Sequence, residues 1–298
     1  MIRRHIFLGL AALALAACAS TPAPEATAGF SSNRIEISTR GGGPDVILIP
    51  GLTSHRDVWE STAAALEDSH TVHVVQVKGF AGVAAEANAE GPVAAPVADE
   101  IARYIREQNL GSAALIGHSM GGTIAMMVAA RHPDAVDRVM VVDMFPWMGA
   151  MFGPPGATTE SVRQTADQIR AQMLAAPPGA ASPMMEQMIS SMVRTESARP
   201  TMLRYAHDSD RRTVANAFHE LIVTDLRPEL SNIRVPLTAL YVIPPNVPIP
   251  AAQYESFMRV SYANAPQTRF VKIDDSYHFI MIDQFDRFMS EVNTFLEN

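Results

Sequence analysis

Several features that would assign a chain to a specialised class are scarce in this sequence. A single cysteine among 298 residues cannot form a disulfide within the chain. The 23 lysines and arginines are outnumbered by 31 aspartates and glutamates. The sequence has no basic cluster of the kind that would indicate nucleic-acid binding. The apolar run at residues 6–17 is too short to span a bilayer comfortably. With 48% hydrophobic residues, the chain is suited to one large α/β domain, or to a domain with an insertion.

The first residues have the composition of a targeting segment. Arg3 and Arg4 precede the apolar run, which ends in the sequence LAAC at residues 15–18. This ending resembles the lipobox of bacterial lipoproteins, in which the cysteine becomes the lipidated first residue of the mature protein. The resemblance implies a signal peptide at residues 1–17 and a lipid anchor on Cys18 that attaches the protein to a membrane. The alternative is an ordinary secretory signal that is cleaved after a small residue, with Cys18 discarded.

The targeting segment predicts a place in the bacterial cell envelope, with the folded part facing the periplasm. Residues 18–30 are expected to be a flexible linker that holds the domain away from the membrane. Ala19 stands where some lipoproteins carry the aspartate that retains them at the inner membrane, which favours the outer membrane. An ordinary secretory signal would release the protein into the periplasm instead.

Beyond residue 30, short apolar runs alternate with segments of helical periodicity. This alternation favours the α/β class, with a mostly parallel, doubly wound sheet and helices on both of its faces. Strands are expected at residues 45–50, 71–77, 113–116, 138–142, 237–243 and 268–273. Helices are expected at residues 56–67, 97–108, 123–131, 251–263 and 284–296.

The middle of the chain, residues 144–234, shows no clear strand. Proline and glycine interrupt it, and the stretches between them favour helices at residues 159–175, 183–194 and 211–223. We therefore expect a helical cap that is inserted into a core formed by residues 31–143 and 235–298. Many methionines lie in this cap, and the sequence PMMEQMISSMV at residues 183–193 is typical of a surface that covers an apolar pocket.

The most informative motif is GHSMGG at residues 117–122, which follows the apolar run at residues 113–116 and precedes a helical pattern. A serine on a sharp turn between a buried strand and a helix is the nucleophile elbow, which holds a hydroxyl clear of its own backbone and near hydrogen-bond donors. The strained turn crowds any side chain two positions away from Ser119, which explains Gly117 and Gly121. The alternative is that these residues are only the glycine-rich start of a helix and have no catalytic role.

With this motif, the chain resembles an α/β-hydrolase with a helical cap, and the similarity runs from about residue 35 to the C-terminus. Residues 49–53 stand where the family has its His-Gly oxyanion loop, with Pro50 in place of the histidine. Residues 76–79 stand where the family usually shows Asp-x-x-Gly, of which only the glycine matches. Residues 275–279 follow the last expected strand, where the family carries its catalytic histidine.

The resemblance implies a catalytic triad and an oxyanion hole. Ser119 is the expected nucleophile and His278 the expected base, because a neutral imidazole can take the serine proton and return it to a leaving group. The chain order, with serine before histidine, fits this fold. The backbone N–H groups of Leu52 and Met120 are expected to bind the negative oxygen of the intermediate. No metal and no organic cofactor are implied.

Several positions compete for the acid of the triad. Asn246 stands in the loop where the family usually carries an aspartate, and an amide cannot stabilise an imidazolium as a carboxylate does. Asp143 follows the strand after the nucleophile helix, which is the position used by some members of the superfamily, and we favour it. Asp274 and Asp275 lie near His278 but are expected to point to solvent. An enzyme without a working acid is the remaining alternative.

Two further histidines lie close to these residues in the sequence. His118 is expected to be structural or to line the pocket, whereas His55, just past the oxyanion loop, either contacts the substrate or lies on the surface. Together the motifs predict a serine hydrolase that cleaves an ester or related acyl bond in a hydrophobic small molecule. The alternative is a catalytically weak or inactive, lipid-anchored binding protein on a hydrolase scaffold.

Overall fold

The computed structural model describes residues 29–111, 113–175, 183–244 and 249–297. The predicted signal peptide, Cys18 and most of the predicted linker lie outside these residues, as does Asn246. Among the helices of the described residues, none combines the length and the apolar character that crossing a membrane requires.

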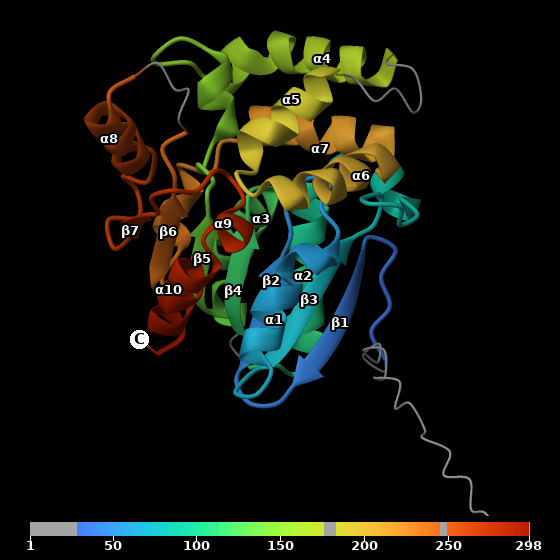
Figure 1. The fold of residues 1–298 in the computed structure, drawn as a ribbon, viewed down its shortest axis with the longest axis vertical. Helices are drawn as coiled ribbons and strands as arrows, with labels where there is room; N and C mark the ends of the chain where they lie inside the picture. The colour runs from blue at the N-terminus through green and yellow to red at the C-terminus, as the bar shows by residue number, and fades with distance from the viewer. Residues whose placement is uncertain (1–28, 112, 176–182, 245–248, 298) are drawn as a thin grey trace, which may run out of the picture.

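A seven-stranded sheet forms the centre of the molecule, in the order β1-β3-β2-β4-β5-β6-β7 (Figure 1). Its strands are β1 (Ile35–Gly41), β2 (Asp45–Ile49), β3 (Thr71–Val77), β4 (Ala113–His118), β5 (Val136–Val142), β6 (Leu237–Tyr241) and β7 (Arg269–Lys272). β1 pairs antiparallel with β3, and the other neighbouring strands pair in parallel. The predicted fold class, a mostly parallel α/β sheet, is confirmed.

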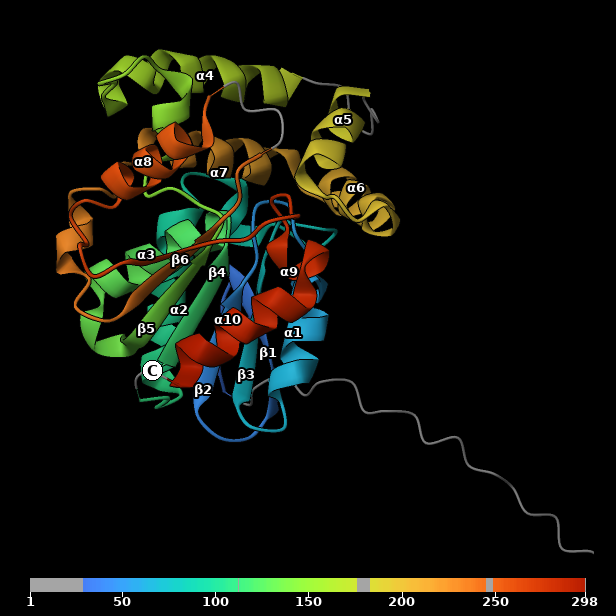
Figure 2. The same ribbon diagram turned by 60° about the vertical axis from the view of Figure 1, so that its left-hand side comes forward.

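Helices cover both faces of the sheet, because successive residues of its central strands are apolar on both sides. In β2, Ile47 and Ile49 pack on the face covered by α2 and α3, whereas Val46 and Leu48 pack on the face covered by α1 and α10. Figures 1 and 2 show these two helical layers on either side of the strands. The core helices are α1 (Glu60–Leu66), α2 (Ala94–Glu107), α3 (Met120–Arg131), α8 (Ala251–Ser261), α9 (Ile280–Asp283) and α10 (Phe285–Glu297).

Between β5 and β6, the described residues form helices and connecting segments but no strand. The four longer helices of this segment are α4 (Thr159–Ala175), α5 (Pro183–Met192), α6 (Arg199–Asp208) and α7 (Arg211–Val223). We call them the inserted helices. Figures 1 and 2 both place them beyond the end of the sheet at which β4 and β5 finish, so they cover its carboxyl edge.

Among the strands and α-helices, three were not predicted from the sequence, namely β1, α6 and α9. β1 is an edge strand in which only Ile35 and Ile37 are buried, so its apolar pattern is short. α6 buries only Met202, which leaves it without a clear apolar face, and α9 has only four residues. An edge strand with two buried residues and a helix with one carry a weak periodic signal, and α9 is too short to show a helical period.

Helix α7 holds the inserted helices on the core through a buried carboxylate. Glu220 is 6% exposed, and its oxygens accept hydrogen bonds from the three backbone N–H groups of residues 93–95 at 2.6, 2.7 and 2.8 Å. These groups begin α2, where the helix dipole favours a negative charge. Nearby, a Cβ atom on Gly79 would lie 2.6 Å from Thr213 Oγ1, so α7 lies directly against the loop after β3.

Candidate active site

Ser119 occupies a strained turn between β4 and α3. Its φ of 53° and ψ of −122° lie outside the regions that a residue with a side chain normally adopts. A Cβ atom on Gly117 would lie 2.1 Å from the Gly121 carbonyl oxygen, so no side chain fits there. The crowding predicted around the serine is therefore confirmed. The turn leaves Ser119 partly exposed at the carboxyl edge of the sheet.

The loop after β2 lies directly against this turn. A Cβ atom on Gly121 would lie 2.1 Å from the Ile49 carbonyl oxygen, and one on Gly51 would lie 3.0 Å from Ser119 Cβ. The backbone of residues 49–52 is thereby held beside the serine. Within the described part of the chain, no group accepts a hydrogen bond from the N–H of Leu52 or of Met120. Both donors are thus available to a ligand, and their role in an oxyanion hole stays a prediction.

Asp143 and His278 lie together, although 135 positions separate them in the sequence. Asp143 follows β5 directly, with a φ of 54°, and its Oδ2 lies 2.6 Å from His278 Nδ1. Its Oδ1 accepts a hydrogen bond from the Val242 N–H at 3.1 Å, which fixes the carboxylate between the ends of β5 and β6. Because a carboxylate accepts, Nδ1 is the donor, and Nε2 of the neutral ring is left as an acceptor.

The other two carboxylates that were considered as the acid, Asp274 and Asp275, face solvent. Asp274 and Asp275 both have side chains that are 77% exposed, and they pair with Lys272 and Arg194 at 3.1 and 3.4 Å. The expectation that they point to solvent is confirmed. Asp143 is thus the carboxylate that contacts the His278 ring among the described residues.

Ser119 and His278 lie at one site without a direct bond between them. Among the described residues, no hydrogen bond joins the Ser119 hydroxyl to the His278 ring. The two segments are joined instead through His118, the residue before the serine. Its Nε2 lies 3.0 Å from the His278 carbonyl oxygen. Bonds between a nucleophile and its base are often long in ligand-free enzymes and shorten only when a substrate binds.

His118 is a buried, neutral histidine. Burial lowers the pKa of its imidazole well below the ordinary value of 6.5, and the positive charge that His278 can carry lowers this pKa further. The hydrogen bond to the His278 carbonyl opposes both effects but is outweighed. The expectation that His118 is structural or lines the pocket agrees with this burial. His55, by contrast, interacts with Asp57 and lies 5.6 Å from the Tyr205 ring, measured between ring centroids.

The loop that carries His278 is clamped to the segment between α5 and α6. Asp283 accepts hydrogen bonds from the backbone N–H groups of Tyr277, Arg194 and Thr195 at 2.9, 3.0 and 2.8 Å. One carboxylate therefore joins the loop to the inserted helices. The sequence analysis missed Asp283, because an aspartate at the end of a four-residue helix belongs to no motif. Two of its three partners, Arg194 and Thr195, lie 89 and 88 positions away in the sequence, and they reveal its role.

Apolar residues that follow Ser119 and Asp143 in the chain belong to the buried core. Met120, Met144 and Phe145 belong to one buried cluster, and Leu52 and Met148 pack against it. Two tyrosines approach Asp143 on this side, and burial, followed by the Asp143 charge, raises the pKa of each phenol above its ordinary value. These tyrosines are Tyr254 and Tyr262. The segment at residues 183–193 was expected to cover an apolar pocket. Among its described side chains, Ile189 and Val193 are buried whereas Met188 is half exposed.

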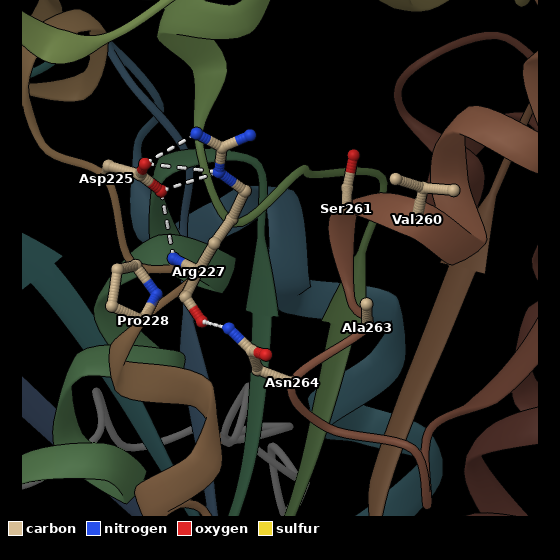
Figure 3. Close-up of a pocket in the computed structure, with 7 residues that line it drawn as sticks. All are labelled: Asp225, Arg227, Pro228, Val260, Ser261, Ala263 and Asn264. Carbon is tan, nitrogen blue, oxygen red and sulfur yellow. Dashed lines mark hydrogen bonds and ion pairs between the residues drawn. The ribbon is translucent and has the colours of Figure 1, made fainter. Parts of the chain in front are cut away.

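A separate depression of about 330 Å³ lies elsewhere, between the end of α8 and the segment after α7 (Figure 3). The Arg227 guanidinium in it is paired with Asp225, and the Arg227 carbonyl accepts a hydrogen bond from Asn264. Its charges are therefore satisfied within the protein, and it shares no residue with the arrangement around Ser119. Across the described residues, no cluster of three or more His, Cys, Asp or Glu side chains could hold a metal ion.

Comparison with known proteins identifies a family and several relatives. Residues 44–285 match the family model described as alpha/beta hydrolase fold. The pimeloyl-[acyl-carrier protein] methyl ester esterase of Aliivibrio fischeri (strain MJ11) is 26% identical over 265 residues, which cover 87% of this chain and 95% of that protein. The enzyme of the same name from Vibrio cholerae is 28% identical over 207 residues, covering 67% of this chain and 76% of that protein.

Solved structures share the fold over most of the chain. The esterase EaEST from Exiguobacterium antarcticum has a TM-score of 0.74 at 18% identity and covers 92% of this chain and 98% of its own. The enol-lactonase from Burkholderia xenovorans LB400 has a TM-score of 0.71 at 18% identity, covering 89% of this chain and 96% of its own. At such identities the likeness concerns the fold alone.

The buried His118 predicts a pH dependence of stability. Because the folded-state pKa is lowered, the unfolded chain binds a proton below about pH 6.5 that the folded protein does not, so the free energy of unfolding falls as the pH falls. One such group contributes a slope of at most about 1.4 kcal/mol per pH unit. In His118→Gln, urea unfolding between pH 6.5 and 5 should show a slope that is shallower by up to this amount. Equal slopes for the two proteins would contradict the assignment.

Proposed function

Because the chain belongs to the alpha/beta hydrolase fold family and is a hydrolase, we propose that it is a serine hydrolase that cleaves a carboxylic ester or related acyl bond in a hydrophobic small molecule. The observation that carries this proposal is the hydrogen bond of 2.6 Å between Asp143 and His278. That bond lies beside a serine with a positive φ at the end of a buried strand. Ser119, His278 and Asp143 would form the triad.

In the proposed first half of the reaction, Ser119 Oγ attacks the carbonyl carbon of the ester while His278 Nε2 takes the hydroxyl proton. The carbonyl oxygen becomes negative and is bound by the N–H groups of Leu52 and Met120. Asp143 stabilises the imidazolium through Nδ1–H. The intermediate then collapses, the bond to the alcohol oxygen breaks, and His278 gives its proton to the departing alcohol. An acyl group remains on Ser119.

In the proposed second half, water replaces the alcohol. His278 Nε2 takes one proton from the water as its oxygen attacks the acyl carbon, and the same two N–H groups bind the oxyanion. When the intermediate collapses, Ser119 Oγ leaves and receives the proton from His278. The products are a carboxylic acid and the free enzyme, so the protein returns to its starting state without a cofactor.

The proposed substrate class follows from the surroundings of the serine. The apolar residues Leu52, Met144 and Phe145 favour a hydrocarbon acyl group over a charged one. The relatives named pimeloyl-[acyl-carrier protein] methyl ester esterase support an ester, and they make a small alcohol such as methanol a sensible leaving group to test. We therefore propose the ester of a hydrophobic acyl chain with a small alcohol.

A second candidate function is a lipid-anchored binding protein that keeps an apolar site without turnover. Within the described residues, the missing hydrogen bond between the Ser119 hydroxyl and the His278 ring favours it. In such a protein the serine would not be activated, because its proton would have no acceptor. The two candidates therefore differ in one property, which is the reactivity of the Ser119 hydroxyl.

A fluorophosphonate probe separates the two candidates. We expect the folded protein to be labelled on Ser119 and to hydrolyse p-nitrophenyl and methyl esters of medium-length acyl chains. Ser119→Ala should abolish both activities, because it removes the attacking oxygen. The control is Ser290→Ala, which changes an exposed serine of α10 and should leave both unchanged. A folded wild-type protein that neither labels nor turns over would favour the binding protein.

The proposed acid is tested by Asp143→Asn. An amide cannot stabilise the imidazolium and can hold the wrong tautomer, and in a serine protease the equivalent change lowers kcat about 10⁴-fold. We expect a loss of about 10³–10⁴-fold in kcat here, measured with p-nitrophenyl esters. Asp274→Asn is the matched control, since this exposed aspartate lies four residues from His278 and should keep full activity. Unchanged hydrolysis by Asp143→Asn would remove Asp143 from the triad.

We also propose that Cys18 carries a lipid anchor that keeps the protein in the bacterial cell envelope, facing the periplasm, with the outer membrane favoured. The support is the sequence pattern at residues 15–18. In a bacterial host, the wild type should partition into the detergent phase of Triton X-114, and Cys18→Ser should shift it to the aqueous phase. Ser20→Ala should partition as the wild type does. A wild-type protein in the soluble periplasmic fraction would indicate an ordinary secretory signal instead.

A further inference from the structure

The side chain before the nucleophile contacts two other segments that the proposed reaction uses. His118 is the last residue of β4 and is 1% exposed. Its Nε2 lies 3.0 Å from the His278 carbonyl oxygen. A carbonyl oxygen can only accept, so Nε2 carries the hydrogen and donates it. His118 therefore binds the backbone of the proposed base and not its ring nitrogens.

The opposite edge of the same ring lies against the oxyanion loop. With its hydrogen on Nε2, His118 has a bare Nδ1, and this atom has no hydrogen-bond partner among the described residues. A Cβ atom on Gly51 would lie 3.0 Å from it, so the Gly51 backbone packs against this edge. A buried polar atom without a hydrogen-bond partner destabilises the folded state. An apolar side chain would avoid this loss of stability, so packing alone does not explain a histidine at this position.

The His118 ring also lies close to two neighbouring aromatic rings. The His118 ring centroid lies 4.6 Å from that of His278 and 4.6 Å from that of Phe279. Phe279 is itself buried, and its N–H donates to the Met192 carbonyl oxygen. The His278 ring thus has the His118 ring beside it and the Asp143 carboxylate at its Nδ1.

We infer that His118 is a positioning residue that sets where the His278 ring stands relative to Ser119. The inference rests on the proposed function. Asp143 fixes the rotation and tautomer of the His278 ring, but it does not hold the His278 backbone. His118 holds the His278 backbone through its hydrogen bond to the carbonyl oxygen. Since Ser119 directly follows His118 in the chain, this hydrogen bond links the positions of the proposed base and the proposed nucleophile. A misplacement of about 1 Å between reacting groups can cost about 10²-fold in rate.

A matched pair of variants isolates the hydrogen bond. In His118→Gln, the side-chain amide nitrogen stands the same number of bonds from the backbone as Nε2 and can donate to the His278 carbonyl. In His118→Met, a chain of the same length has no donor. We expect the Gln variant to keep kcat within about threefold of the wild type, and the Met variant to lose about 10–100-fold in kcat with KM within about threefold. Thermal unfolding of both variants checks that the Met variant is folded at the assay temperature.

Equal kcat values in the two variants would overturn the inference, because packing alone would then explain His118. A second measurement needs no variant. The ¹⁵N spectrum of the histidine-labelled wild type at pH 7.5 should show His118 with hydrogen on Nε2 and a bare Nδ1, and the opposite tautomer would also overturn the inference. Failure of the proposed function looks different, since the wild type itself would then neither label at Ser119 nor hydrolyse esters.

Discussion

The backbone of Gly121 lies so close to the loop after β2 that no side chain fits between them, and the rest of the site depends on this contact. A Cβ atom at this position would lie 2.1 Å from the Ile49 carbonyl oxygen and 2.8 Å from that of Pro50. The close approach brings together two loops that come from the neighbouring strands β2 and β4. The strained conformation of Ser119, with its φ of 53°, is held by this packing.

The carboxylate that contacts His278 belongs to Asp143, which follows β5, but the end of β6 lies in the same region. β5 and β6 are neighbours in the sheet, so a side chain that follows either strand reaches the same region above the carboxyl edge. Asp143 follows β5, and its φ of 54° turns the chain sharply away from the strand. The Val242 N–H, just beyond β6, then holds one oxygen of the carboxylate while the other meets His278. A carboxylate that follows either strand can therefore reach the imidazole of His278.

The loop that carries His278 is held from two sides by different parts of the chain. From the core, His118 donates to its backbone. From the segment between α5 and α6, the N–H groups of Arg194 and Thr195 bind the Asp283 carboxylate, which also accepts from Tyr277. Helix α7 is anchored separately by Glu220 at the start of α2. The segment between α5 and α6 is therefore bonded to the loop that carries His278, and α7 is bonded to the start of α2.

The fold class could be predicted from the sequence alone, and so could the candidate residues Ser119 and His278. Apolar runs that fill both faces of a parallel sheet, and glycines that a sharp turn requires around Ser119, are local properties that a pattern reveals. It also pointed to Asp143, but only as one of several carboxylates. The tertiary structure showed which carboxylate contacts His278, and it revealed the contacts of Asp283 and Glu220 and the hydrogen bond from His118 to the His278 backbone. Each of these contacts joins residues far apart in the chain. Their partners are set by how strands and helices pack, and no local spacing of residues records that.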